Sequence, residues 1–217
     1  MPVSRANASQ ADRVPDRVPD RVPDRVSEQR STILAAAISI LHERGAGALT
    51  VRSVATLAGC STSGVYTWFG GKHGLVEAIF IDGFERFGQA LIEVRARAVP
   101  EEALAALGHA YRDWALANPT HYMVMFGRAV PGFEASPEAL VTARATFTEL
   151  VDVTDEALRR LGIAGSAVDV AHHMWAGIHG YVSLQLAGMD MTRDDAEHRR
   201  RFDEGMRLLA KACFATD

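Results

Sequence analysis

After Ser27, apolar residues recur at spacings of three and four positions through almost the whole chain, and this feature constrains the fold most strongly. The first such run, which ends before Gly45, comprises Ile33, Leu34, Ala37, Ile40 and Leu41. No stretch combines sustained apolar–polar alternation with the turn residues that border strands. The sequence therefore predicts an all-α fold of about nine helices and no β-sheet. The expected helices cover residues 27–44, 51–58, 62–68, 72–97, 101–117, 120–126, 137–161, 167–187 and 192–214.

The N-terminal part lacks this spacing. Residues 12–26 repeat the tetrapeptide DRVP, in which each proline removes an amide donor and the single valine cannot build a core. We expect residues 1–26 to form a disordered, solvated tail.

Composition and charge exclude several classes of protein. The hydrophobic fraction of 48% is typical of a globular protein. Cys60 and Cys213 have no disulfide or metal-binding pattern, and we expect no cofactor. The chain shows no secretory signal and no apolar run long enough to span a bilayer, so we expect a cytoplasmic protein without a membrane partner. The net charge is -4, but basic residues predominate up to Leu75, which suits a protein that touches a polyanion at one end.

Residues 49–69 read LTVRSVATLAGCSTSGVYTWF and have the spacing of a helix-turn-helix. Ala55 is small enough for a third helix to cross over it. Gly59 can adopt the positive φ that the turn needs. Val65 can fill the angle between the two helices.

The second helix of this pair carries more polar and aromatic residues than it can bury. Its N-terminal end is the part that a recognition helix presents to the major groove, where hydroxyls bond phosphates or base edges. Lys72 lies near the start of the next helix, whose positive N-terminus helps to hold a phosphate. The residues around Val65 are Thr62, Ser63, Gly64, Tyr66, Thr67 and Trp68.

This region resembles the DNA-binding domain of TetR-family transcriptional regulators, without insertion. The matching residues are Thr50, Val51, Arg52, Ala55, Gly59, Ser61, the run from Val65 to Phe69, Lys72 and Leu75. The resemblance implies a homodimer that binds a palindromic double-stranded DNA operator. Residues 27–72 would form the helix-turn-helix domain, and residues 73–217 a helical domain that binds an effector and dimerises.

The resemblance also implies roles for single residues. The expected DNA contacts are Thr50, Arg52, Ser61, Thr62, Ser63, Tyr66, Thr67, Trp68 and Lys72. By this resemblance, Tyr66 and Thr67 would face the DNA, and Lys72 would clamp its backbone. For Trp68, packing and a backbone contact are both open. Val65 and Phe69 belong to the core.

Residues 174–188, MWAGIHGYVSLQLAG, carry a ridge of small residues that lets another helix approach closely. The pattern of Trp175, His179 and Gly180 resembles the C-terminal domain subgroup of this family that is named for its Trp-His-Gly motif. That resemblance implies a dimeric four-helix bundle formed by this helix, the last helix and their copies. The expected interface residues are Ala176, His179, Gly180, Ser183 and Ala187. The histidines lack the spacing of a metal site, so none is expected.

An effector site needs apolar walls with a few polar points. The candidates are Tyr111, Trp114, Tyr122, Met123, Phe126, Phe147 and Trp175, which could equally form ordinary core between helices. Arg112 or Arg128 could bind a ligand carboxylate or be solvated.

The function predicted from these observations is a ligand-responsive repressor that leaves its operator when a small apolar or aromatic effector binds. The alternative is a regulator of the same family without an effector, whose C-terminal domain only dimerises or binds a protein. An enzyme is not expected, because the chain has no nucleophile elbow, glycine-rich phosphate loop, HExxH motif or paired cysteines.

Overall fold

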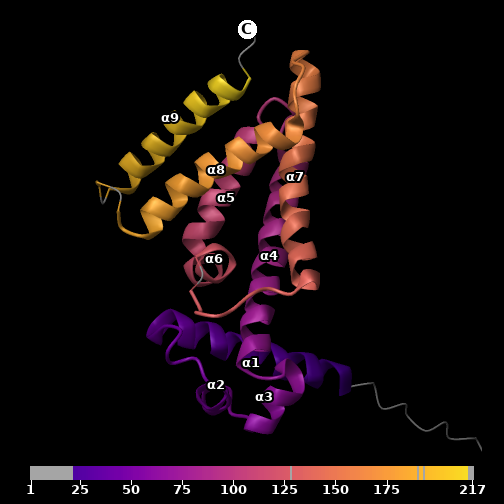
Figure 1. Ribbon diagram of the computed structural model, residues 1–217, viewed down its shortest axis with the longest axis vertical. Coiled ribbons are helices and arrows are strands. Elements are labelled where there is room, and N and C mark those ends of the chain that lie inside the picture. The colour runs from indigo at the N-terminus through magenta and orange to yellow at the C-terminus, as the bar shows by residue number, and fades with distance from the viewer. Residues whose placement is uncertain (1–21, 128, 190, 193, 215–217) are drawn as a thin grey trace, which may run out of the picture.

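The computed structural model describes residues 22–127, 129–189, 191–192 and 194–214. Within these ranges the chain forms nine α-helices and no strand, which confirms the predicted all-α fold (Figure 1). The helices are α1 (Val22–Arg44), α2 (Val51–Leu57), α3 (Thr62–Phe69), α4 (Lys72–Arg97), α5 (Ala103–Ala117), α6 (Pro119–Phe126), α7 (Pro137–Leu161), α8 (Ala167–Leu186) and α9 (Asp195–Cys213). None of these helices has the length and apolar character needed to cross a membrane.

Helix α1 begins at Val22, before the expected start at Ser27. Residues 22–26 were assigned to the tail and are instead helical, which is a correction to that boundary. Pro23 does not prevent this start, because the first turn of a helix contains amides that have no partner within the helix. The rest of the repeat, and with it most of the predicted tail, lies outside the described residues.

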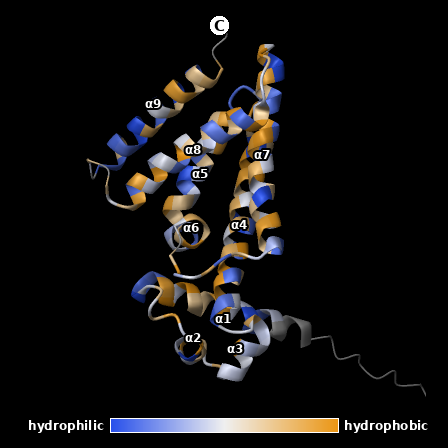
Figure 2. Cartoon of the chain, in the orientation of Figure 1, coloured by the Kyte–Doolittle hydropathy of each residue, from blue (hydrophilic) through white to orange (hydrophobic). Residues whose placement is uncertain are grey.

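Helix α4 joins the two parts of the molecule. Near its N-terminus it packs against α1 and α3, and farther along it packs against α5, α6 and α7 (Figure 1). Leu75 and Ile79 are fully buried at the first end, and Phe84, Phe87 and Leu91 are buried farther along. Hydrophobic and hydrophilic residues alternate in bands along α4 and α7, as expected of helices with one buried face (Figure 2).

Helix ends follow the local chemistry of the sequence. The Ser136 hydroxyl accepts a hydrogen bond from the Ala139 amide at the start of α7, and Gly162 ends that helix with a positive φ of 66°. The carboxylate of Glu77 on α4 accepts a hydrogen bond from the Ser136 amide at 3.0 Å. This bond holds the start of α7 against α4. Hydrogen bonding by the Ser136 side chain, together with that of its amide, lowers the pKa of Glu77.

The junction between α3 and α4 depends on glycine. Gly70 ends α3 with a φ of 68°, and Gly71 precedes α4 with a φ of 120°. Gly74 lies in the first turn of α4, where a Cβ atom would collide with the carbonyl oxygen of Phe69. The close approach of these two backbones fixes the direction of α3 relative to α4.

Helices α8 and α9 also meet at glycines. A Cβ atom on Gly177 would collide with the side chain of Leu209, and one on Gly205 would collide with the ring of Tyr181. The two helices therefore pack side by side at close range, as Figure 1 shows.

We predict that Gly74→Ala lowers the free energy of unfolding by about 2 kcal/mol, because a backbone carbonyl cannot move aside easily. Gly108→Ala is the matched control, since its new Cβ would meet Ile178 at an ordinary 3.7 Å. The control should be neutral or stabilising by up to about 1 kcal/mol, because alanine favours the helix. Urea denaturation followed by circular dichroism measures both changes, and equal losses at the two positions would contradict the assignment.

Candidate DNA interface and internal cavity

Helices α2 and α3 meet at a tight turn that small residues permit. Ala55 and Val65 are buried at the crossing, and Gly59 has a φ of 65°. The Cys60 amide donates a hydrogen bond to the Ala55 carbonyl at 3.0 Å, which closes the turn. This is the helix-turn-helix geometry that the spacing of the three residues predicted.

Two of the predicted DNA contacts cap these helices. Thr50 and Ser53 form a capping box, in which the side-chain oxygen of each accepts a hydrogen bond from the amide of the other at 3.0 Å. The Ser61 hydroxyl oxygen accepts a hydrogen bond from the Gly64 amide at 3.0 Å. Accepting that bond leaves the Ser61 hydroxyl hydrogen available to a phosphate oxygen. Both side chains are therefore fixed in place by the helix ends that they stabilise.

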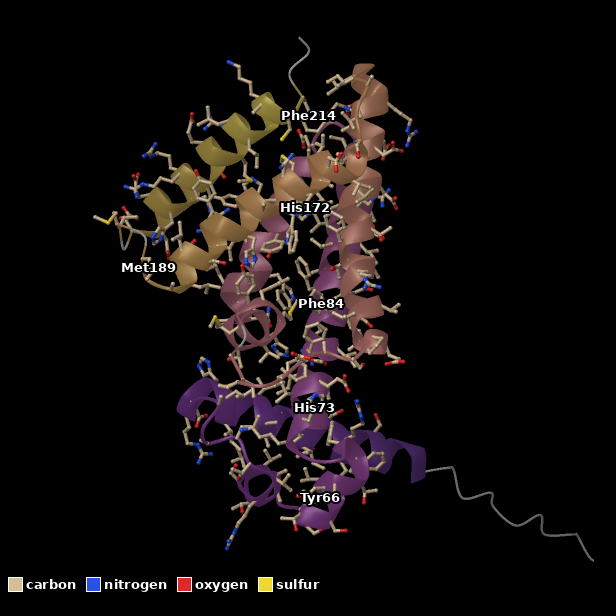
Figure 3. The ribbon with its side chains drawn as sticks, viewed as in Figure 1. Tyr66, His73, Phe84, His172, Met189 and Phe214 are labelled. Atoms are coloured by element: carbon tan, nitrogen blue, oxygen red, sulfur yellow. The ribbon has the colours of Figure 1, made fainter. Side chains whose placement is uncertain are left out.

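The outer face of α3 carries the predicted base and phosphate contacts. Thr62, Ser63, Tyr66 and Thr67 are exposed, and Tyr66 has 58% of its surface accessible. Figure 3 labels Tyr66 on α3, at the end of the molecule opposite α9. Trp68 differs from these residues because it is half-buried and packs against the core. Of the two roles left open for Trp68, its position favours packing.

Cations flank this face without acidic partners. Arg52 is exposed on α2, and together with Arg44 it borders a shallow hollow beside Thr50. The Lys72 ammonium donates a hydrogen bond to the Ala46 carbonyl at 3.0 Å, which ties the start of α4 to the turn after α1. In the described part of the chain, none of these three cations forms an ion pair. An exposed face with hydroxyls and uncompensated cations is suited to a polyanion.

The C-terminal helices enclose a cavity of about 280 Å³. Its walls come from α4, α5, α6, α7 and α8 and are mostly aromatic and aliphatic. Four of the seven predicted effector residues line it, namely Tyr111, Phe126, Phe147 and Trp175. Phe84, which Figure 3 labels on α4, and Phe87 also line it, although their helical spacing indicated only core packing.

The other three predicted effector residues do not line this cavity. Trp114 packs against the ring of Phe87, with the ring centres 5.1 Å apart. Met123 lies on an exposed part of α6, and Tyr122 belongs to a separate polar cluster. Spacing along α5 and α6 placed these residues near one another, but it could not show which face of each helix meets α4 and α7.

A buried polar cluster lies beside the cavity. Nδ1 of His179 on α8 is 3.0 Å from the Tyr111 hydroxyl and 2.8 Å from the Tyr122 hydroxyl. The Tyr122 hydroxyl is also 3.1 Å from the Ser183 hydroxyl. Burial lowers the pKa of His179 and raises the pKa of both tyrosines, so all three side chains are neutral near pH 7. A neutral imidazole that accepts at Nδ1 carries its proton on Nε2.

The cluster includes two of the predicted interface residues, His179 and Ser183, and the interface itself stays a prediction. The side chains of His179 and Ser183 bind hydroxyl groups of α5 and α6, and both residues are half-exposed in the single chain. Ala176 and Ala187 are exposed, and Gly180 has no atom within 4 Å of an added Cβ. Ala176, Gly180, Ser183 and Ala187 lie three or four residues apart, so they form one stripe of α8, which the single chain leaves partly exposed. Nothing in the spacing could reveal the tyrosine partners of His179, because they are far away in the sequence.

Two arginines were considered as ligands for the carboxylate of an effector, and the structure describes one of them. Arg112 is buried, with its guanidinium 5.8 Å from the centre of the Phe202 ring and 3.4 Å from the Asp113 carboxylate. It is therefore not solvated, and it does not line the cavity. Arg128 lies outside the described residues.

Both parts of the chain match models of known protein families. A family model described as "Bacterial regulatory proteins, tetR family" matches residues 33–79. A second model, "Tetracyclin repressor-like, C-terminal domain", matches residues 104–209. The HTH-type transcriptional regulator Rv1816 of Mycobacterium tuberculosis is 24% identical over 202 residues, which cover 78% of this chain and 85% of that protein.

Solved structures share the fold. A protein with unknown function from Rhodococcus sp. RHA1 is 29% identical, with a TM-score of 0.70 over 84% of this chain and 95% of that chain. The TetR family transcriptional regulator PfmR from Thermus thermophilus is 18% identical, with a TM-score of 0.61 over 81% of this chain and 97% of that chain. The likeness therefore extends across both the helix-turn-helix and the helices that enclose the cavity.

The half-buried His179 predicts a pH dependence of stability. An unfolded histidine titrates near pH 6.5, and the pKa of folded His179 lies below that value. The unfolded state therefore binds more protons in this window, and the free energy of unfolding should fall as the pH drops below about 6.5. His179 should contribute a slope of at most about 1.4 kcal/mol per pH unit.

Urea denaturation between pH values of about 7.5 and 5 measures this slope, in a range where carboxylates stay ionised. His179→Gln should flatten the slope, whereas the exposed His173→Gln is the matched control and should leave it unchanged. Equal slopes in wild type and His179→Gln would show that His179 is not the group that titrates.

Proposed function

Because the chain belongs to the TetR family of transcriptional regulators, which bind DNA through a helix-turn-helix, we propose that it is a homodimeric repressor of a palindromic operator. In this proposal a small apolar or aromatic molecule enters the internal cavity and releases the DNA. The proposal is carried by one observation, the exposed hydroxyl and aromatic face of α3 flanked by unpaired cations.

The proposed contacts follow from the positions of these side chains. Ser61, Thr62 and Ser63 lie at the N-terminus of α3, where backbone amides and hydroxyls are directed toward an approaching phosphate. Tyr66 projects from the following turn toward the groove. Arg52 contacts the phosphate backbone, and Lys72 does so if it exchanges its bond to Ala46 for one to a phosphate.

The dimer would be formed through α8 and α9. Leu184 on α8 and Leu208 on α9 are large apolar residues that remain exposed in the single chain. Ala176 and Ala187 on α8 would let a second copy approach closely. Such a dimer would separate the two α3 helices by about one turn of DNA, roughly 34–36 Å.

Effector binding would act through α4. Phe84 and Phe87 of α4 line the cavity, while Leu75 and Ile79 of the same helix lie in the core beside α1 and α3. If the ligand binds more tightly to the conformation with α4 in one of two positions, it shifts the protein toward that conformation. The DNA affinity then changes by as much as the ligand's affinities for the two conformations differ. The cavity counts against the alternative of a C-terminal domain that only dimerises or docks a protein.

DNA binding can be tested by fluorescence anisotropy with labelled DNA from upstream of the protein's own gene. Tyr66→Ala should weaken binding about tenfold through a lost contact in the groove. Arg52→Gln should reduce the slope of log affinity against log salt concentration by about one. The exposed Arg159→Gln, on α7, is the control and should bind normally. Normal binding by Tyr66→Ala would remove α3 from the interface.

The dimer can be tested by sedimentation velocity. Leu184→Arg should shift the protein to a monomer. Leu184 is 51% exposed on the proposed interface, and burying an unpaired arginine there would cost several kcal/mol of desolvation free energy, about the scale of a lost ion pair. Val141→Arg, at a position 63% exposed on α7, is the matched control and should remain a dimer. A dimer that persists in Leu184→Arg would place the interface on another face.

A further inference from the structure

The cavity wall offers a ligand very few polar groups. The Tyr111 hydroxyl is bound to His179, and the Thr146 hydroxyl donates a hydrogen bond to the Ala143 carbonyl at 2.7 Å. Among the described residues that line the cavity, none is acidic and the charged one is Arg144. The electrostatic character of the site therefore depends on this arginine.

Arg144 is unlike the other arginines of α7 because it has no acidic partner among the described residues. Arg159 pairs with Asp155 at 2.9 Å, and Arg160 pairs with Glu101 at 3.3 Å. The positive charge of Arg144 is thus not neutralised by the protein.

The position of Arg144 places this charge at the edge of the cavity. Leu140, Arg144 and Phe147 lie three or four residues apart on one stripe of α7, and all three line the cavity. Leu140 and Arg144 are also exposed, so the cavity reaches the surface at this stripe. An arginine in such a place lays its aliphatic stem on the apolar wall and keeps its guanidinium in water.

We propose that the cavity binds apolar monoanions, with an aromatic or aliphatic body inside and a carboxylate or sulfonate on Arg144. This inference rests on the proposed function, because it names the class of effector. A guanidinium binds such anions through two parallel hydrogen bonds. A cationic ligand would be repelled by Arg144, and the described residues that line the cavity include no carboxylate to offset that repulsion. A neutral analogue would gain the apolar contacts but not the ion pair.

A matched pair of fluorescent probes tests the charge preference. 1-Anilinonaphthalene-8-sulfonate is an aromatic monoanion, and N-phenyl-1-naphthylamine has the same rings without the sulfonate. Both should gain fluorescence on binding to the full-length wild-type protein. Arg144→Gln should weaken binding of the sulfonate roughly three- to tenfold, and Arg144→Glu should weaken it further. Binding of the neutral amine should be the same in all three proteins.

Two further variants locate the probes and control for general charge effects. Arg159→Gln removes a paired arginine from the same helix outside the cavity, and it should leave sulfonate binding unchanged. Ala143→Phe fills the cavity from its α7 wall, and it should abolish binding of both probes. Thermal melts of each variant establish that it is folded.

The outcomes separate this inference from the proposed function. If both probes bind but the affinity for the sulfonate is unchanged in Arg144→Gln and Arg144→Glu, the proposed preference for anions is wrong and the cavity remains an effector site. If neither probe binds the wild-type protein, the inference and the effector part of the proposed function both fail. DNA binding, measured separately by anisotropy, would stand in either case.

Discussion

The arrangement of the molecule depends on the continuity of α4, whose 26 residues extend over about 39 Å. Its apolar face belongs to the core around α1 and α3 at one end and to the core around α5, α6 and α7 farther along. A closely packed interior has low compressibility and transmits strain, so a displacement of α4 in one core is felt in the other. The glycine junction at Gly74 then ties α3 directly to the start of α4, so the helix that carries the exposed hydroxyls cannot turn independently of α4.

The apolar character of the cavity depends on the polar cluster beside it. The hydroxyls of Tyr111 and Tyr122 are bound to His179, so the walls next to them present rings and not free polar groups. Rings from α4, α6 and α8 contact one another on these walls, namely those of Phe84, Phe126 and Trp175. Arg144 is the exception on these walls, since it brings a charge to the rim and has no acidic partner among the described residues. This combination makes the site apolar inside and positive at its edge.

Local chemistry made much of this structure predictable. Thr50 and Ser61 start helices and Gly162 ends one, for reasons that act within a few residues, and these boundaries lie close to where the sequence placed them. Three residues, Ala55, Gly59 and Val65, were enough to predict the helix-turn-helix from the sequence. The sequence was less informative where contacts join distant elements. The two tyrosines that satisfy His179 come from other helices, and Arg112 is buried over Phe202 of α9 although an arginine on an amphipathic helix is usually solvated. Helical spacing identifies an apolar face but not the element that covers it.

The central claim is that α4 couples the cavity to DNA binding, and a reciprocity measurement tests it most directly. The affinity of 1-anilinonaphthalene-8-sulfonate would be measured with free protein and with protein saturated by DNA from upstream of its own gene. The DNA affinity would be measured with and without the probe. Linkage requires both ratios to be equal, and the coupling proposed here predicts that each ligand weakens the other by the same factor, about five-fold or more. A probe affinity that is identical in free and DNA-bound protein would contradict the account.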